Sequence, residues 1–293
     1  MILITIPAYN EGGTIGNIIG QIKEVMDECK WKYKVLVVDD GSLDKTAIEA
    51  KDAGAVVYSH PRNYGLAETF KTEIEKSIEL KAEIIVHIDA DGQYKAEEIP
   101  KLIDEVKNGY DLVLGSRFKG RIESMPFINW IGNKAFSRVI SQVTGIRISD
   151  AQTGFRAFTK EVAQKILITS NHTYTQEQII KAVKQKFKIR EVPIFFAKRI
   201  HGKSRLIKNP LRYATRAWID IFRIYRDFEP LKFFGLFGGS FFTVGFLIGL
   251  FILYTFMVRG YVGGLPRVLL SVLFMSMGVQ IFLFGFLADM GRK

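Results

Sequence analysis

The sequence predicts an α/β fold with a doubly wound, mostly parallel sheet, followed by an apolar helical hairpin. The first half alternates short β-branched apolar runs with stretches of helical spacing, as expected for a parallel sheet covered by helices on both faces. Near the C-terminus, two stretches at about 233–257 and 268–288 carry no charge. Each is long enough to cross the roughly 30 Å hydrocarbon core of a bilayer as a helix.

Strands are predicted where apolar, β-branched residues run together in the first half. These runs are Ile2–Ile6, Val35–Val38, Ala55–Tyr58, Ile84–Ile88 and Leu112–Leu114. After residue 120 the alternation fades, and the pattern predicts helices at 126–144 and 175–186, a loop entering a strand at 150–158 and a late strand at 189–199. The expected organisation is a sheet domain over 1–207, an amphipathic helical region over 208–232 and a hairpin over 233–293.

The net charge indicates anionic binding partners but does not distinguish among them. The 293 residues carry a formal net charge of +11, which favours anionic partners: nucleic acid, phosphorylated small molecules or an anionic membrane face. Cys29 is the single cysteine, so an internal disulfide is excluded and a reducing compartment is expected. The N-terminal MILITIPAYNE has no basic leader and predicts a first strand rather than a signal peptide.

Polar residues gather directly after the predicted strands. The clusters are PAYNE (7–11), DDGS (39–42), DADGQ (89–93) and GSRF (115–118). Ser42 alone would pass for a helix cap, and Asp40 with Gly41 for a turn. Four clusters at the carboxyl ends of strands, where open α/β sheets bind their ligands, favour a binding site instead.

Asp89 and Asp91 place two like charges one residue apart, which is unfavourable unless a cation or a proton lies between them. Alternate residues of a strand point to opposite faces, so the two carboxylates converge only if the strand gives way to a turn, which Gly92 permits. Mg²⁺ binds one or two carboxylates together with phosphate oxygens. The pair therefore predicts a divalent cation on a nucleotide diphosphate. The G-x-G-x-x-G and G-x-x-x-x-G-K-[ST] motifs are absent, which disfavours a dehydrogenase or an ATPase.

The same clusters, followed by SDAQTGFRAF (149–158), resemble the motifs of family 2 glycosyltransferases with the GT-A fold. The C-terminal region resembles their polyprenyl-phosphate branch, which includes the dolichol-phosphate mannose synthases. The resemblance covers about residues 1–207 as motifs, and the two later spans match in placement. It implies a Rossmann-like GT-A domain followed by an interfacial helix and a transmembrane hairpin.

The resemblance also implies roles on the donor side. The residues that would line the nucleoside pocket are Pro7, Tyr9, Glu11 and Asp39, with Asp40 and Ala90 nearby. A divalent metal, Mg²⁺ or Mn²⁺, would be held on the diphosphate by Asp89, Asp91 and Gln93. A basic loop that closes over the phosphates would use Arg199, Ser204 and Arg205.

On the acceptor side, the resemblance implies that Arg117 meets an acceptor phosphate. Asp150 and Arg156 would shape the acceptor and sugar side. The glycine and serine neighbours of both arginines indicate loops, where phosphate or acidic partners are favoured over plain surface charge. Glu177 aligns with an acidic residue at the start of a family helix, or simply favours a helix N-terminus. The catalytic set would be Asp91, Arg117 and Asp150.

The implied reaction is inverting transfer of a hexose from a GDP- or UDP-sugar to a polyprenyl or dolichyl phosphate, with mannose as the first expectation and glucose or GlcNAc as alternatives. A phosphate monoester has a second pKa near about 6 and is already anionic, so it needs no general base. With a sugar hydroxyl as acceptor in cell-surface glycan synthesis, a base is required, and Asp150 is its candidate. A non-catalytic, membrane-anchored nucleotide-sugar binder is disfavoured by the intact carboxylates. No nucleic acid partner is expected.

Residues 209–234 interleave arginines with aromatic and aliphatic residues, which predicts a helix in the membrane interface or an amphipathic helix docked on the domain. Basic residues before the first span and after the second predict an integral membrane protein with its catalytic domain and C-terminus in the cytoplasm. Arg259 and Arg267, between the spans, reduce this contrast. Association of copies through the spans stays open.

Overall fold

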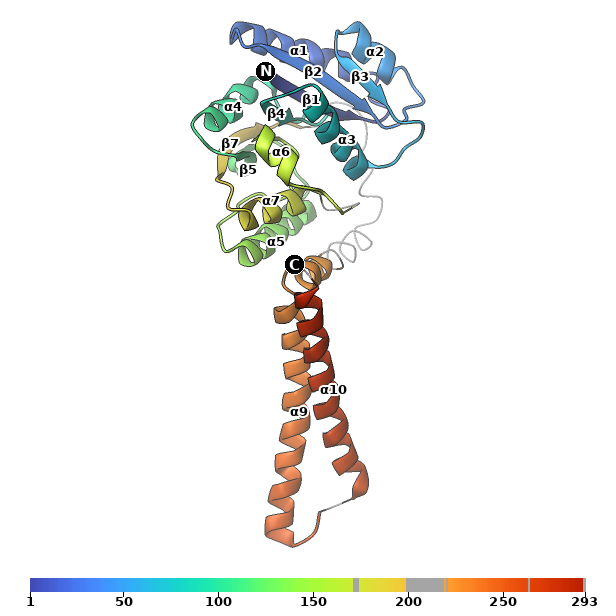
Figure 1. Ribbon diagram of the computed structural model, residues 1–293, viewed down its shortest axis with the longest axis vertical. Helices are drawn as coiled ribbons and strands as arrows, with labels where there is room; N and C mark the ends of the chain where they lie inside the picture. Colours follow the sequence, from blue (N-terminus) through green and yellow to red (C-terminus); the bar gives the residue numbers. More distant parts are fainter. Residues whose placement is uncertain (171–173, 199–218, 220, 263, 292–293) are drawn as a thin grey trace. The chain divides into compact units, whose positions relative to one another are not determined.

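The computed structural model describes residues 1–170, 174–198, 219, 221–262 and 264–291. The chain divides into two compact units, 1–213 and 214–293. Each unit is described by itself: the first is a sheet between layers of helices, and the second contains a pair of long helices (Figure 1).

Within the described residues, the first unit has one seven-stranded sheet with the order β3-β2-β1-β4-β6-β5-β7. The strands are β1 Ile2–Ala8, β2 Tyr33–Asp39, β3 Val56–Ser59, β4 Ile84–His87, β5 Leu112–Ile122, β6 Arg156–Thr159 and β7 Ile189–Phe196. Only β6 among them runs antiparallel to its neighbours, β4 and β5. The predicted doubly wound, mostly parallel fold is confirmed.

Amphipathic helices cover this sheet. They are α1 Ile15–Glu28, α2 Thr46–Asp52, α3 Leu66–Glu79, the short 3₁₀ helix η1 Ala96–Glu98, α4 Ile99–Lys107, α5 Phe127–Thr144, α6 Lys160–Lys165 and α7 Tyr174–Lys184. In α1, Ile15, Ile18, Ile19 and Ile22 recur at helical spacing and are buried against the sheet. Figure 1 shows α3 and α6 side by side. The predicted helices at 126–144 and 175–186 are confirmed as α5 and α7, to within two residues at each end.

The pairing of three strands brings their carboxyl ends to one edge. β1 pairs in parallel with β2, with Ala8 opposite Asp39, and with β4, with Thr5 opposite His87. The segments that follow these strands therefore leave the sheet on the same side. This edge carries the first three polar clusters found in the sequence.

β5 is longer than the sequence predicts. The apolar run ends at Leu114, but pairing with β7 continues to Ile122, with a register shift between Ser116 and Arg121. GSRF therefore lies inside a strand, and Arg156 is the first residue of β6. The expectation that Arg117 and Arg156 lie on loops was wrong, because pairing with neighbouring strands overrides the low strand propensity of glycine and serine.

The second unit contains two antiparallel helices, α9 Pro230–Arg259 and α10 Leu265–Met290. Both are long and apolar enough to cross a membrane, and most of their residues are exposed in the structure. They include the predicted spans 233–257 and 268–288. Of the predicted interfacial region, residues 209–218 and 220 lie outside the described residues, and 221–228 are helical.

Small residues form the contact between α9 and α10, here called the glycine seam. Its members recur seven residues apart on each helix (238 to 245; 271 to 278 to 285): Gly238, Gly245, Ser271, Gly278 and Gly285. A Cβ at Gly278 would lie 2.6 Å from the backbone nitrogen of Phe242. The Ser271 hydroxyl donates to the Gly245 carbonyl oxygen at 2.7 Å. Close backbone approach through small residues is typical of helix pairs in membranes.

The substitution Gly120→Ala tests the close approach of β5 and β7. A Cβ at this position would lie 1.9 Å from the Ile194 carbonyl oxygen, so one strand must shift. Overpacking of this kind costs about 1–3 kcal/mol. The thermal unfolding midpoint of the full chain in detergent should fall by several degrees.

Gly20→Ala on α1 is the matched control, because among the described residues nothing beyond its own stretch of helix lies within 4 Å of the added Cβ. It should leave the midpoint unchanged or raise it, since alanine favours a helix over glycine by about 1 kcal/mol. Equal midpoints for Gly120→Ala and the unmodified chain would contradict the close approach.

Candidate active site

Hydrogen bonds join the segments that follow β1 and β2. The backbone nitrogen of Asn10 donates to the Ser42 hydroxyl at 2.8 Å, and the Asn10 side-chain oxygen accepts from the backbone nitrogen of Leu43 at 2.8 Å. The backbone nitrogen of Glu11 donates to the Thr46 hydroxyl at 2.9 Å. The segment that carries Tyr9 and Glu11, both predicted to line a nucleoside pocket, is thus fixed beside the end of β2.

Asp39 and Asp40 are both buried but have different partners. Asp39 accepts a hydrogen bond from the backbone nitrogen of Ser42 at 3.1 Å. Asp40 binds three groups that follow β3: the His60 ring nitrogen at 2.8 Å and the backbone nitrogens of Tyr64 at 2.9 Å and Gly65 at 2.8 Å. Asp40 therefore holds the 60–65 loop in place and contributes its charge to the edge.

The chain turns directly after β4, at the two spaced carboxylates. Gly92 has a φ of 71°, which favours glycine. Asp91 accepts from the backbone nitrogen of Gln93 at 3.1 Å, and the Gln93 amide donates to the Ala197 carbonyl oxygen at 3.2 Å. The turn is thereby connected to the residue that follows β7. The Thr14 hydroxyl, 3.2 Å from the Ala90 carbonyl oxygen, connects it to the β1 segment as well.

The donor set of this turn fits a hard divalent cation. Asp89 and Asp91 supply carboxylate oxygens and Gln93 an amide oxygen, the ligand types of Mg²⁺ and Mn²⁺. Gly154 leaves room for the first carboxylate, since a Cβ there would lie 2.6 Å from Asp89 Oδ2. Across the described residues, no cluster of three or more His, Cys, Asp and Glu side chains could hold a metal alone. A cation here would need oxygens from a bound diphosphate as well.

Arg117 and Asp150 form a buried, two-pronged ion pair. Arg117 Nε lies 2.7 Å from Asp150 Oδ2, and Nη2 lies 2.8 Å from Oδ1. The backbone nitrogen of Arg117 also donates to Oδ2 at 3.0 Å. Burial alone lowers the pKa of Arg117, but neighbouring Tyr94 and Asp150 raise it above its ordinary value. Both carboxylate oxygens of Asp150 are therefore engaged by one arginine.

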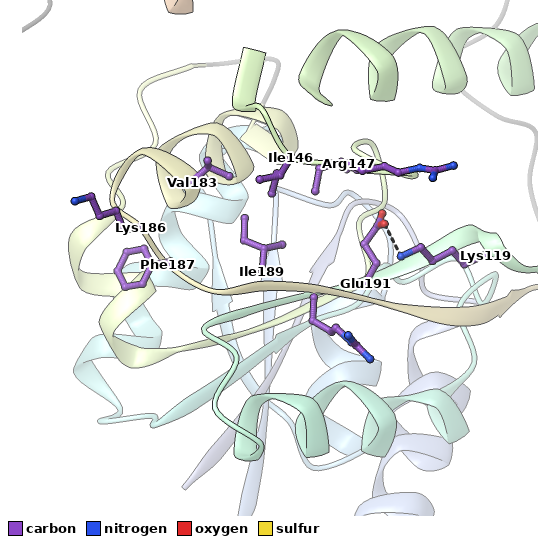
Figure 2. Close-up of a pocket in the computed structure, with 10 residues that line it drawn as sticks. Lys119, Ile146, Arg147, Val183, Lys186, Phe187, Ile189 and Glu191 are labelled. Atoms are coloured by element: carbon purple, nitrogen blue, oxygen red, sulfur yellow. Dashed lines mark ion pairs between the residues drawn. The ribbon is translucent and has the colours of Figure 1, made fainter. Parts of the chain in front are cut away.

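Glu191 on β7 supports the segment that carries Asp150. One of its oxygens accepts from the Ser149 backbone nitrogen at 2.8 Å, the Ser149 hydroxyl at 2.9 Å and the Asp150 backbone nitrogen at 3.0 Å. The other pairs with Lys119 at 2.9 Å (Figure 2). These two side chains also line a groove of about 460 Å³. The residues that line it do not include any of the predicted site residues.

Arg156 and Glu177 are buried and form hydrogen bonds within the protein. Arg156 is fully buried and donates to the Gly154 carbonyl oxygen at 3.4 Å and the Gln178 side-chain oxygen at 2.8 Å. Glu177 accepts from the backbone nitrogens of residues 169 and 170 at 2.9 and 2.8 Å and pairs with Lys181 at 2.7 Å. Burial alone raises the pKa of Glu177, but the hydrogen bonds from Lys181 and residue 169 lower it below its ordinary value. Contact of either residue with a substrate stays a prediction.

Two buried polar residues beside Asp89 were not expected from the sequence. His87 Nδ1 lies 2.6 Å from Glu73 Oε2, and its Nε2 lies 3.7 Å from Asp89 Oδ1. Burial alone lowers the pKa of His87, but Glu73 and Asp89 raise it to about 9. A histidine inside the apolar run Ile84–Ile88 was the signal that could have revealed them.

Part of the predicted site lies outside the described residues. This part is the basic loop, with Arg199, Ser204 and Arg205. The roles implied for these residues stay predictions.

Known structures and sequences resemble the chain at two levels. A crystal structure of glucosyl-3-phosphoglycerate synthase from Mycobacterium tuberculosis, in complex with Mn²⁺, UDP and phosphoglyceric acid, superposes with a TM-score of 0.59 and 18% identity over 75% of this chain and 78% of that one. At this identity the likeness concerns the fold. The dolichyl-phosphate hexose transferase of Haloferax volcanii is 33% identical over 205 residues, 69% of this chain and 85% of the relative.

Two further comparisons extend along the chain. Glycosyltransferase AglJ of Haloferax volcanii is 29% identical over 294 residues, 99% of this chain and 93% of the relative. A family model described as glycosyl transferase family 2 matches residues 3–167, the part of the chain that contains β1 to β6, the Asp89–Asp91 turn and the Arg117–Asp150 pair. The chain belongs to glycosyl transferase family 2.

Proposed function

We propose that this glycosyltransferase is a membrane-bound, inverting enzyme that moves a hexose from a nucleotide sugar to a polyprenyl phosphate with the help of a divalent cation. The observation that carries the proposal is the Asp89–Asp91 turn at the carboxyl edge of the sheet, in a chain with two helices long and apolar enough to cross a membrane. The similarity to a dolichyl-phosphate hexose transferase supports this acceptor class. Mannose remains the first expectation for the sugar.

The donor would bind along the edge formed by β1, β2 and β4. Tyr9, Glu11 and Asp39 would contact the nucleoside, since the segments that follow β1 and β2 are held together by hydrogen bonds from backbone nitrogens to the Ser42 and Thr46 hydroxyls. Asp89, Asp91 and Gln93 would hold Mg²⁺ or Mn²⁺ against the diphosphate. Such an ion, when bound, neutralises the charge of the nucleotide leaving group. The protein's part is to hold donor and acceptor in line, so that a single displacement inverts the anomeric carbon.

The acceptor side of the site favours a phosphate over a hydroxyl. Asp150 is fully buried and both its oxygens bind Arg117, so it is poorly placed to take a proton from a sugar hydroxyl. A phosphate monoester does not need that base. Asp150 would instead hold the guanidinium of Arg117 in place, and Arg117 would stabilise the acceptor phosphate.

The membrane part of the proposal follows from α9 and α10. An antiparallel pair of spans returns the chain to the side from which it started, so the glycosyltransferase domain and the C-terminus share one face of the membrane. The excess of basic residues flanking the pair supports the cytoplasmic face. A water-soluble nucleotide sugar would then meet a lipid acceptor at that surface.

Incubation of the purified chain with a panel of GDP- and UDP-sugars and a polyprenyl phosphate tests the function directly. One donor should yield an alkaline-stable, acid-labile lipid-linked monosaccharide in the presence of Mg²⁺ or Mn²⁺. Transfer to a free sugar acceptor but to no lipid phosphate would contradict the proposed acceptor class.

The substitution Asp91→Asn tests the metal assignment. It removes a charged oxygen ligand but keeps the size of the side chain, so metal-dependent nucleotide binding and turnover should fall by at least about 100-fold. Calorimetry with UDP or GDP, with and without Mn²⁺, measures the effect. Unchanged thermal stability controls for folding, and full activity of the variant in EDTA would refute the assignment.

The substitution Asp150→Asn separates a positioning role from a base. Removal of the charge leaves the Arg117 guanidinium buried without its counter-ion, which costs about 3–5 kcal/mol. The thermal midpoint should therefore fall markedly. A variant as stable as the parent would contradict the positioning role, whereas loss of turnover alone would not, because displacement of Arg117 also lowers turnover.

A further inference from the structure

A chain of three ionisable side chains leads from α3 to Asp89, and its first two members, Glu73 and His87, are buried. Glu73 lies on α3 and is 1% exposed, and His87, the last residue of β4, is 0% exposed. His87 Nδ1 lies 2.6 Å from Glu73 Oε2, and its Nε2 lies 3.5 Å from the Tyr174 hydroxyl and 3.7 Å from Asp89 Oδ1. Glu73 and His87 are called the Glu73–His87 pair below.

The Glu73–His87 pair links α3 to β4 at a high desolvation cost. β4 lies between β1 and β6, and its other residues are Ile84, Ile85 and Val86. A buried ion pair at such a place is often less stabilising than apolar side chains of similar volume. In addition, Glu73 Oε1 has no hydrogen-bond partner in the part of the chain that the structure describes, which is a further cost. Fold stability therefore does not account for the pair.

The surroundings of the pair fix the direction of the imidazole ring. Phe70 packs edge-on against it with ring centroids 5.1 Å apart, and Tyr174 does so at 6.0 Å. Glu73 is fixed in turn, because Oε2 accepts from the Thr5 hydroxyl at 3.1 Å as well as from the ring. The ring is therefore held with Nε2 between Asp89 and the Tyr174 hydroxyl.

The Asp89 carboxylate is confined from a second direction. Gly154, which precedes β6, approaches so closely that a Cβ would lie 2.6 Å from Oδ2 and 3.0 Å from Oδ1. The buried guanidinium of Arg156 holds that glycine through its carbonyl oxygen at 3.4 Å. With His87 near Oδ1 and Gly154 near Oδ2, rotation of the carboxylate is restricted before any ligand binds.

We propose that Glu73 and His87 are positioning residues that orient the Asp89 carboxylate as a ligand for a divalent cation. The inference rests on the metal site of the proposed function and extends it to two residues outside that site. Partners that orient a ligand in this way commonly change metal affinity by about 10- to 100-fold when they are replaced. The effect belongs to metal binding and not to the transfer step.

The experiment measures Mn²⁺ binding to the full chain in detergent, with UDP and with GDP, by electron paramagnetic resonance of the free ion. Glu73→Gln and His87→Gln should each raise the Kd for Mn²⁺ by about 10-fold or more. The Kd for Mn²⁺ of the double variant should exceed that of the more weakly binding single variant by no more than about twofold. Both residues act through the same series of contacts to Asp89, so their effects should not add. Turnover of each variant should recover at saturating Mn²⁺.

Ser77→Ala is the matched control. Ser77 is buried on α3, and its hydroxyl donates to the Glu73 backbone carbonyl at 2.6 Å, so the variant disturbs the same turn of helix but none of the side-chain contacts of the pair. It should lower stability and leave the Kd for Mn²⁺ unchanged. Thr5→Val removes the second hydrogen bond to Glu73, together with the longer contact of the hydroxyl with the Val86 carbonyl oxygen at 3.4 Å. It keeps both ionisable residues, and its Kd for Mn²⁺ should shift in the same direction as that of Glu73→Gln.

Equal Mn²⁺ affinity in the parent chain, Glu73→Gln and Thr5→Val would overturn the inference and leave the proposed function standing. Additive effects of the two glutamine variants would overturn it too, since they would mean independent actions. Failure of the parent chain to bind Mn²⁺ with either nucleotide would sink both this inference and the metal assignment. A missing transfer product with intact Mn²⁺ binding would count against the proposed acceptor alone.

Discussion

The parallel pairing of β1 with β2 on one side and β4 on the other is the constraint on which the site depends. The register places Ala8 opposite Asp39 and Thr5 opposite His87, so three segments leave the sheet at one edge. Parallel strands need long crossover connections, here α1, α2 and α3 with their loops, which pack against the sheet and leave the edge open. A site of this kind therefore combines residues that are far apart in sequence. Each of them lies within a few residues of the end of a strand.

The carboxylates of the first unit divide into two kinds. Asp40, Asp150 and Glu191 are buried, and each accepts several hydrogen bonds or ion pairs from the protein itself. Asp89, with its side chain 30% exposed, lies where ligands can reach it. Withdrawing a fully bonded buried carboxylate from its partners is costly, so the first kind can fix loops but is poorly suited to exchange ligands. The acidic edge thus contains buried carboxylates that fix loops, and fewer carboxylates that are available to bind a ligand.

The sequence predicts the strands and helices well wherever one pattern dominates. β1 and β2 contain apolar, β-branched runs, and their positions are close to those expected. β5 was cut short at Leu114, because its continuation depends on pairing with β7, more than 60 residues later. The local sequence of β5 carries no information about its pairing with β7.

The candidate site shows the same limit. The motifs identified Arg117 and Asp150 as members of one site but not as partners of each other, since they are 33 residues apart in sequence. His87 lies within the predicted strand Ile84–Ile88, and the sequence pattern did not single out Glu73. Only the packing of α3 against β4 brings them together beside Asp89.

The glycine seam between α9 and α10 has a mechanical consequence. Where Gly238, Gly245 and Gly278 let the backbones touch, a shift of one helix along the other would press a bulkier neighbour onto main-chain atoms. The two helices are thereby locked against sliding and behave as one stiff rod with a fixed length. A bilayer that becomes thinner or thicker must be met by tilting this rod as a whole, because neither helix can adjust its depth alone.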